Sequence, residues 1–244
     1  MKKRIYTVLE VIFIAIFIFS LSQLIKIGLD YRRGNQLYEG VQNKVEEVTE
    51  SKKDYHFLVD LNELQKTNKD IAGWIKVPDT PIDYPVLEPE DNQYYLKHTY
   101  DNIYSDFGSI FIDKYCTMDD KNTVIYGHNT RNDAMFGSLK KYKDSDYFNN
   151  HPNVYLLYGD TEKQYQIVAA LTVEITDPIY KFQFSDSKEQ KQWIEDIYNR
   201  AECNRPDMKF TGEEKFITLS TCTSRTKTER FVIVAKEVKT VWAK

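Results

Sequence analysis

Cysteine is scarce in this sequence: Cys116, Cys203 and Cys222 are its three cysteines among 244 residues. Three are too few for a disulfide scaffold. No pair of cysteines or histidines has zinc-ligand spacing, so no metal site is expected. Lysine and arginine are scattered through a chain of net charge −4, which excludes the basic stripe of a nucleic-acid-binding protein. No segment repeats at a fixed period, which excludes a solenoid.

A single long apolar run is present, from Ile5 to Leu29, and three basic residues precede it. As a helix this run would rise roughly 37 Å, more than the thickness of about 30 Å of a hydrocarbon core. A cleaved signal peptide is the alternative, but no small-x-small cleavage site follows the run. We therefore expect residues 1–29 to be an uncleaved membrane anchor. Basic residues flank both ends, so charge alone does not fix its orientation.

Residues 30–70 are polar and charged, and we expect them to form a helical stalk. Apolar residues recur at helical spacing between Gln36 and Glu50, which predicts a short amphipathic helix. Val59 to Lys69 is a second candidate helix, with Asp60 as its cap.

From residue 71 to residue 244 the chain is rich in short β-type segments, and we expect one catalytic domain there. Many short strands in one domain indicate a barrel or a sandwich. One helix is predicted between two strands, from Ser185 to Glu202. The predicted strands are Gly73–Pro78, Ser109–Asp113, Thr123–Tyr126, Val154–Tyr158, Gln164–Ile175, Lys215–Thr221 and Arg230–Val241.

The last two strands carry the first chemical signal. If they form an antiparallel hairpin, Cys222 and Arg230 face each other across its mouth, with side chains about 4.5–5.5 Å apart at Cβ. Alternation then puts Ser220 and Val232 on the same face as this pair. Positive charge favours a thiolate, which is the nucleophilic form of cysteine. A guanidinium also offers several donors to a developing oxyanion.

Four histidines are candidates for the general acid or base: His56, His98, His128 and His151. His128 directly follows a predicted strand and a glycine, in Tyr126-Gly127-His128-Asn129. That position at a strand end suits an active site, whereas a surface or packed histidine is the ordinary alternative.

These motifs together resemble the sortase family. The resemblance rests on Thr218-Leu219-Ser220-Thr221-Cys222, on the later Arg230, and on Tyr126-Gly127-His128-Asn129. The helical N-terminal extension and the helix before the cysteine strand resemble class B of that family. The resemblance covers about residues 71–241. One departure is Ser224, where some class B members have an acidic residue.

The resemblance implies a mostly β fold: a closed eight-stranded sortase-type β-barrel, with N-terminal helices and a helix inserted before the cysteine strand. It implies that His128, Cys222 and Arg230 are catalytic and that no cofactor or metal is needed. Cys222 would attack a threonine carbonyl in a sorting signal and form a thioacyl enzyme. His128 would protonate the leaving amine and then help an incoming amine to attack. Arg230 would position the substrate and stabilise the oxyanion.

The resemblance also implies substrate contacts, partners and a location. The partners are surface proteins that carry sorting signals, an amine of a peptidoglycan precursor or crossbridge, and the membrane through the N-terminal helix; no nucleic acid is expected. The enzyme would be a single-pass protein of the cell membrane with an extracellular catalytic domain, anchoring surface proteins to the cell wall. The expected substrate-binding residues are Ser220, Tyr126, Asn92, Leu96, Ile179 and Tyr180.

Other functions stay open from the sequence. A sortase that polymerises pilins has the same motifs. An L,D-transpeptidase or a cysteine protease also uses Cys and His, but an L,D-transpeptidase has a glycine before its cysteine, where this chain has Thr221. A non-enzymatic alternative is a membrane-tethered binding module in which Cys222 is a packed strand residue. The sorting-signal sequence and the acceptor amine are not determined by the sequence.

Overall fold

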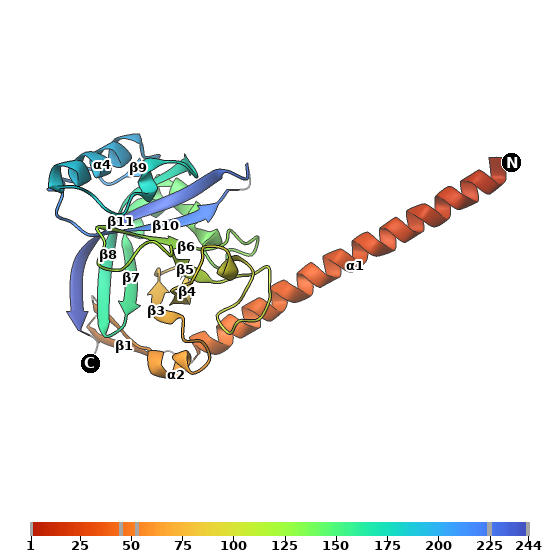
Figure 1. Ribbon diagram of the computed structural model, residues 1–244, viewed down its shortest axis with the longest axis horizontal. Coiled ribbons are helices and arrows are strands. Elements are labelled where there is room, and N and C mark those ends of the chain that lie inside the picture. Colours follow the sequence, from red (N-terminus) through yellow and green to blue (C-terminus); the bar gives the residue numbers. More distant parts are fainter. Residues whose placement is uncertain (1, 44–45, 52–53, 224–225, 243–244) are drawn as a thin grey trace.

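A closed mixed β-barrel forms the body of the molecule, and a long helix projects from it (Figure 1). The computed structural model describes the backbone of residues 2–43, 46–51, 54–223 and 226–242, and the side chains of residues 5–43, 59–223 and 226–240. The eight strands of the ring are β3 (Ile71–Lys76), β4 (Asp83–Leu87), β5 (Ile110–Ile112), β6 (Asn122–Tyr126), β7 (Asn153–Tyr158), β8 (Thr161–Glu174), β10 (Phe216–Cys222) and β11 (Glu229–Trp242).

The ring closes because β11 pairs antiparallel with both β10 and β8. Strands β6 and β10 pair in parallel, as do β4 and β5. The remaining neighbours in the ring are antiparallel. The two-residue strand β9 (Cys203–Asn204) adds to β8 outside the ring. This arrangement confirms the predicted closed eight-stranded barrel.

Both faces of the cysteine hairpin are buried, because β10 and β11 lie between two apolar clusters. One face points into the barrel and the other is covered by helix α4 (Ser187–Arg200). Asp186 caps α4 by accepting a hydrogen bond from the backbone N–H of Glu189. The inserted helix predicted before the cysteine strand is therefore confirmed. The short helices of the connections are η1 (Tyr94–Leu96), η2 (Gly137–Lys143), α3 (Ser145–Asn150) and η3 (Pro178–Tyr180).

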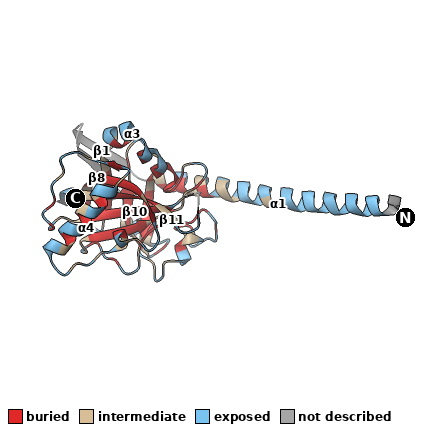
Figure 2. Cartoon of the chain, turned by 90° about the horizontal axis from the view of Figure 1, so that it is seen from above, coloured by how far each residue is buried: buried red, intermediate tan, exposed pale blue. Residues whose placement is uncertain are grey.

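The projecting helix α1 (Lys2–Gln42) has two parts with different surroundings. Its N-terminal part is long and apolar enough to cross a membrane, and the apolar window is wholly exposed. Figure 2 shows this exposed length leading into buried turns at the barrel. In those turns Tyr38 and Val41 are almost completely buried in the main core. The end of α1 therefore belongs to the folded domain.

A glycine lets α1 approach the barrel closely. A Cβ atom on Gly34 would lie 2.6 Å from the ring of Phe107, which is shorter than van der Waals contact. Tyr31 and Tyr38 flank this point, with ring centroids 5.8 Å and 5.6 Å from that of Phe107. The glycine costs some helix propensity, and in return the helix lies directly on the Phe107 ring.

The helix predicted over Gln36–Glu50 is wrong beyond Gln42. Strands β1 (Glu46–Ser51) and β2 (Asp54–Leu58) form a separate antiparallel hairpin there, so residues 30–70 are not wholly helical. The apolar spacing of the segment matched a helix, but valine and threonine favour strands. The second predicted helix is present in shortened form as α2 (Leu61–Gln65), and Asp60 caps it as predicted by accepting from the N–H of Glu63.

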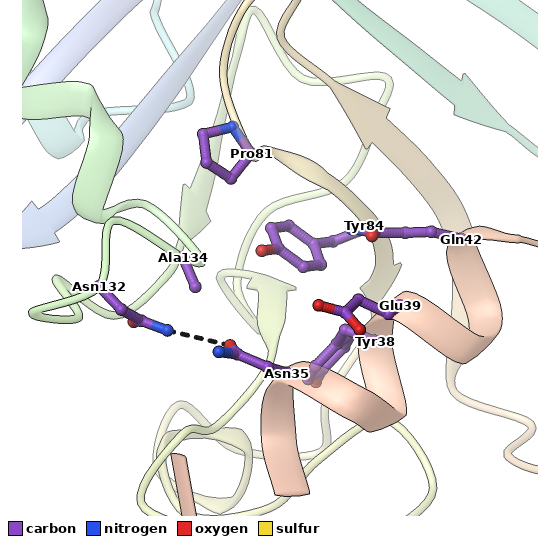
Figure 3. A pocket seen from close by; sticks show the side chains of 8 residues that line it. All are labelled: Asn35, Tyr38, Glu39, Gln42, Pro81, Tyr84, Asn132 and Ala134. Carbon is purple, nitrogen blue, oxygen red and sulfur yellow. Dashed lines mark hydrogen bonds between the residues drawn. The ribbon is translucent and has the colours of Figure 1, made fainter. Parts of the chain in front are cut away.

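A cleft of about 230 Å³ separates the last turns of α1 from the barrel (Figure 3). Asn35, Glu39 and Gln42 line it from the helix. Across the cleft the side-chain amide of Asn132 donates to the side-chain Oδ1 of Asn35, at 3.0 Å. Asn132 lies in the connection after β6, so α1 touches the segment that begins at the end of that strand.

Candidate active site

The hairpin register brings the thiol and the guanidinium to one place. Cys222 pairs with Arg230, and Ser220 pairs with Val232, as the alternation of the sequence predicts. Cys222 is exposed at the end of β10. The Nη1 of Arg230 donates to the backbone carbonyls of Lys227 and Glu229, at 2.8 Å and 3.0 Å. These two bonds orient the plane of the guanidinium beside the cysteine.

Parallel pairing of β6 with β10 brings the histidine to the same end of the sheet. Ser220 pairs with Tyr126, so the residues that follow both strands leave the barrel at one rim. The N–H of Gly127 donates to the carbonyl of Ser220, at 3.2 Å. The side-chain amide of Asn129 donates to the carbonyl of Cys222, at 2.8 Å. The histidine segment and the cysteine strand are thus joined on both sides of His128.

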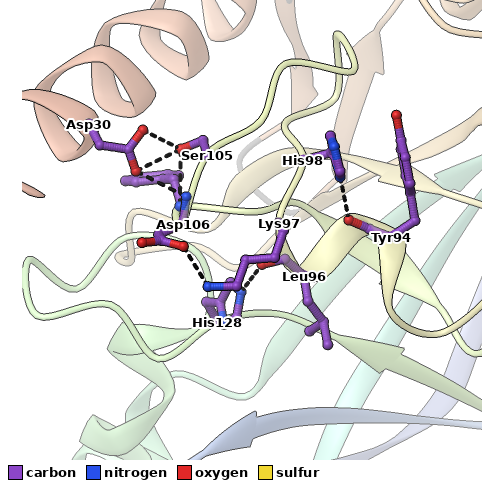
Figure 4. A network of polar contacts seen from close by, with 9 residues as sticks. Asp30, Tyr94, Leu96, Lys97, His98, Ser105, Asp106 and His128 are labelled. Carbon is purple, nitrogen blue, oxygen red and sulfur yellow. Dashed lines mark hydrogen bonds and ion pairs between the residues drawn. The ribbon is translucent and has the colours of Figure 1, made fainter.

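A hydrogen bond fixes the orientation of the His128 ring. Its Nε2 lies 2.7 Å from the carbonyl oxygen of Leu96 (Figure 4). Because a carbonyl only accepts, Nε2 carries the proton, and Nδ1 is the basic nitrogen of the neutral ring. Burial lowers the pKa of His128, and the bond to Leu96 partly offsets that effect. An imidazolium of lowered pKa is a stronger acid, which favours proton transfer to a leaving group.

The three residues share one groove of about 450 Å³. Among the described residues that line it, Arg230 alone carries a permanent charge. The exposed surface of the wall is mainly apolar, as is typical of ligand-binding grooves. The described lining comprises Asn92, Leu96, Phe111, Tyr126, Gly127, His128, Ile175, Tyr180, Ser220, Thr221, Cys222 and Arg230.

Five of the six expected substrate-binding residues line this groove: Asn92, Leu96, Tyr126, Tyr180 and Ser220. Their polar groups bond to one another or to the wall. The phenol of Tyr126 donates to Asp113, and so does the side-chain amide of Asn92. The hydroxyls of Tyr180 and Ser220 lie 3.0 Å apart. These bonds fix the positions of the Tyr126 and Tyr180 rings in the groove wall.

The sixth expected residue, Ile179, is not among the described residues that line the groove. Its side chain is fully buried in the cluster beneath α4 and does not line the groove. Ile179 and Tyr180 both belong to η3, in which Tyr180 faces the groove and Ile179 packs with the residues of α4. Ile175, which was not predicted, lines the groove and is exposed.

The other two cysteines lie in different surroundings. Cys116 and Cys203 are both buried. Burial raises the pKa of Cys116 to about 12, so its thiol stays protonated and unreactive at neutral pH. The thiol of Cys203 donates to the carbonyl of Lys143, at 3.6 Å. Ser224, the departure noted in the cysteine–arginine loop, lies outside the described residues.

Gly108 contributes to the site, although no sequence motif marks it. Its φ is +65°, and a Cβ there would lie 2.6 Å from Cδ2 of His128 and 2.8 Å from the carbonyl oxygen of Tyr95. The backbone of Gly108 therefore lies directly against the edge of the imidazole that carries Nε2, where a side chain would not fit. The opposite edge, with Nδ1, is left for other contacts.

We expect Gly108→Ala to displace the His128 ring and to reduce activity about 10²-fold, the effect of a misplacement near 1 Å. Gly159→Ala is the matched control, since Gly159 has φ +54° but nothing within 4 Å of its Cβ position. Both changes incur the backbone cost of a positive φ, on the order of 1 kcal/mol. Steady-state kinetics and thermal unfolding of both variants separate the two effects. Equal activity in the two variants would contradict the packing role of Gly108.

Comparison with known proteins identifies the family. Residues 75–238 match the model of the sortase domain. Sortase B of Listeria monocytogenes is 38% identical over 185 residues, which are 73% of this chain and 74% of that protein. Sortase B of Staphylococcus aureus is 28% identical over 242 residues, which are 97% of this chain and 98% of that protein.

Solved structures agree with the sequence comparison. A Staphylococcus aureus sortase B–substrate complex superposes with a TM-score of 0.75 at 26% identity, covering 86% of this chain and 99% of that one. Clostridium perfringens sortase B superposes with a TM-score of 0.69 at 32% identity, covering 73% of this chain and 99% of that one. The barrel, the cysteine hairpin and the inserted helix are thus features of a known fold, and this chain belongs to class B of the sortase family.

Proposed function

We propose that the protein is a membrane-tethered class B sortase in which Cys222, His128 and Arg230 carry the reaction. As a class B sortase it is a cysteine transpeptidase that anchors surface proteins. One observation carries the assignment of residues: the pairing of Cys222 with Arg230 at the rim of a groove that His128 also lines. Nucleophile, proton carrier and oxyanion donor come together there in the arrangement that acyl transfer needs.

In the first half-reaction the Cys222 thiolate attacks the carbonyl carbon of a threonine in the sorting signal. A carbon–sulfur bond forms, and negative charge develops on the carbonyl oxygen. Arg230 stabilises that charge by hydrogen bonding. The carbon–nitrogen bond then breaks, and the leaving amine takes a proton from the His128 imidazolium. The products are a thioacyl enzyme and a released C-terminal peptide.

In the second half-reaction an amine of a peptidoglycan precursor or crossbridge attacks the thioester carbon. The new carbon–nitrogen bond forms, the carbon–sulfur bond breaks, and the thiolate of Cys222 is restored. The neutral His128 ring accepts the proton that the amine loses. This order needs no cofactor or metal, because thiol, imidazole and guanidinium supply the nucleophile, the proton transfer and the charge stabilisation.

The N-terminal part of α1 is the proposed membrane anchor, with residues 1–29 in or at the bilayer and the catalytic domain outside the cell. Support comes from its length, its exposed apolar side chains and the location of the reaction's substrates. A single span then holds the groove on the side where sorting signals and cell-wall amines meet.

The test is transpeptidation by a fragment of residues 30–244. A library of fluorogenic sorting-signal peptides with a soluble amine acceptor should give both a cleaved peptide and an amide-linked product. Mass spectrometry distinguishes that product from simple hydrolysis. A folded fragment that cleaves no peptide in the library would count against the proposed function.

Truncation separates the anchor from the domain. We expect the 30–244 fragment to be folded and active, because every described groove residue is retained. A 43–244 fragment should lose on the order of 3–5 kcal/mol of unfolding free energy, the cost of removing a buried large aromatic. The reason is that Tyr38 and Val41 are core residues. Chemical denaturation of both fragments measures the difference, and equal stability would contradict the packing of α1.

A further inference from the structure

One face of α1 contacts the segment Ser105–Ser109 at successive turns. Asp30, Gly34 and Tyr38 are spaced by four residues, so they lie on one side of the helix. The carboxylate of Asp30 accepts from the hydroxyl of Ser105, at 2.8 Å, and from the N–H of Asp106, at 3.0 Å. Gly34 lies on the ring of Phe107. Tyr38 reaches the two residues that follow.

Tyr38 makes the contact nearest to the histidine. Its side chain is 2% exposed, and its hydroxyl donates to the carbonyl of Gly108, at 2.8 Å. The same hydroxyl lies 3.0 Å from Oγ of Ser109, which in turn donates to the carbonyl of His98. A buried phenol with these partners fixes where the Gly108 backbone stands.

The segment that α1 holds is the segment that holds His128. Gly108 packs on one edge of the imidazole. The carbonyl of Leu96 accepts the hydrogen bond from Nε2 of His128. The neighbouring residue, Tyr95, is bound to the same segment, because its carbonyl accepts a hydrogen bond from the N–H of Ser109, at 2.9 Å. Figure 4 shows the chain of contacts from Asp30 through Ser105 and Asp106 to Lys97, Leu96 and His128.

We propose that Asp30, Gly34 and Tyr38 are positioning residues for His128, so that the helix leading from the membrane sets the geometry of the proton-transfer step. The three residues act through the Ser105–Ser109 segment and touch no reacting atom. The inference rests on the proposed role of His128. The end of α1 that contacts the barrel is therefore part of the catalytic apparatus and is more than a spacer between the bilayer and the barrel.

The decisive comparison is Tyr38→Phe against Tyr142→Phe in the full chain, solubilised in detergent. Both tyrosines are buried, and the Tyr142 hydroxyl has no hydrogen-bond partner among the described residues. Tyr38→Phe should lower kcat about tenfold with little change in KM, a fraction of the 10²-fold loss from a 1 Å misplacement. It should also move the His128 limb of the pH profile. Tyr142→Phe should change neither.

A readout independent of turnover is the pKa of His128, followed by NMR of ¹³C-labelled histidine in both variants. Should Tyr38→Phe fold poorly, Asp30→Asn tests the other end of the same face, where the side chain is partly exposed. It should shift the His128 titration in the same direction. Unchanged kcat and unchanged His128 pKa in folded Tyr38→Phe or Asp30→Asn would overturn the inference. Full activity of His128→Ala would instead overturn the proposed role of the histidine, and with it the basis of this inference.

Discussion

Cys222→Ala is expected to abolish peptide cleavage and transpeptidation while leaving the barrel intact. Deleting the nucleophile of a hydrolase lowers kcat by a factor on the order of 10⁶, which puts the variant at background. The fold should survive, because the Cys222 side chain is exposed at the end of β10 and supports no core contact. Kinetics, circular dichroism and peptide-binding measurements on the same preparation check both halves of the expectation.

Cys116→Ala and Cys203→Ala are the matched controls, because each removes one thiol from a buried position. Both should retain most activity and lose some stability from the small cavities they create. Alkylation of the folded wild-type protein should modify Cys222 and spare the other two. If either control loses activity without unfolding, the assignment of a single nucleophile is wrong. If Cys222 resists alkylation, a packed strand residue in a binding module becomes the better interpretation.

Arg230→Lys is expected to be far more damaging than conservation of charge implies. Lysine still favours the thiolate, but it lacks the planar fork that holds a substrate carbonyl and an oxyanion together. It also cannot keep the two bonds to the carbonyls of Lys227 and Glu229 and still offer further donors in the same plane. Loss of one oxyanion donor typically costs about 10²–10³ in rate, roughly 2.7–4 kcal/mol. The loss should fall mainly on kcat, because the contact strengthens as charge develops.

Lys236→Arg is the control for Arg230→Lys, since it exchanges the same two cations on the same strand away from the groove. It should be nearly neutral. Steady-state kinetics with one well-cleaved peptide decide the matter. A lysine variant at position 230 that kept more than about half of the wild-type kcat/KM, an effect near 0.4 kcal/mol, would rule out the oxyanion role.

The cysteine hairpin was predictable because alternation fixes both faces and register. Once β10 and β11 were taken as antiparallel, the pairing of Cys222 with Arg230 followed from the polar residues between them. The inserted helix was predictable for a similar reason, since Asp186 caps it and Trp193 and Ile194 mark its buried side. In these elements local propensity and tertiary contacts favour the same structure.

Other parts depended on contacts that the sequence does not display. Strand β4 contains Pro85 and begins at Asp83, both unfavourable in strands. Pro85 nevertheless pairs with Trp74 of β3, and it precedes Val86, the first residue of β4 that pairs with β5. Most of β1 fell within the helix predicted over Gln36–Glu50, because apolar spacing is ambiguous over so short a segment.

Within the site, the groove-facing residues were found by motif, and the supporting residues were not. Gly108 stands far from both motifs in the sequence, and its role appears only when φ and the distance to His128 are known. Ile179 and Tyr180 were both expected in the groove, but adjacent residues of the short helix η3 point in different directions, and only Tyr180 lines it. Positions in turns are set by backbone dihedrals, which composition does not specify.

The pairing of strands that are distant in the sequence determines when in folding the active site forms. Strand β10 has a parallel partner, β6, that lies far back in the sequence, and β11 must reach both β10 and β8 to close the ring. Contacts between distant segments form late and slowly in folding. Cys222 and His128 therefore meet only when the last strands dock. Until those strands dock, the thiol of Cys222 lies apart from the imidazole of His128, and the protein gains activity in the same step that completes its fold.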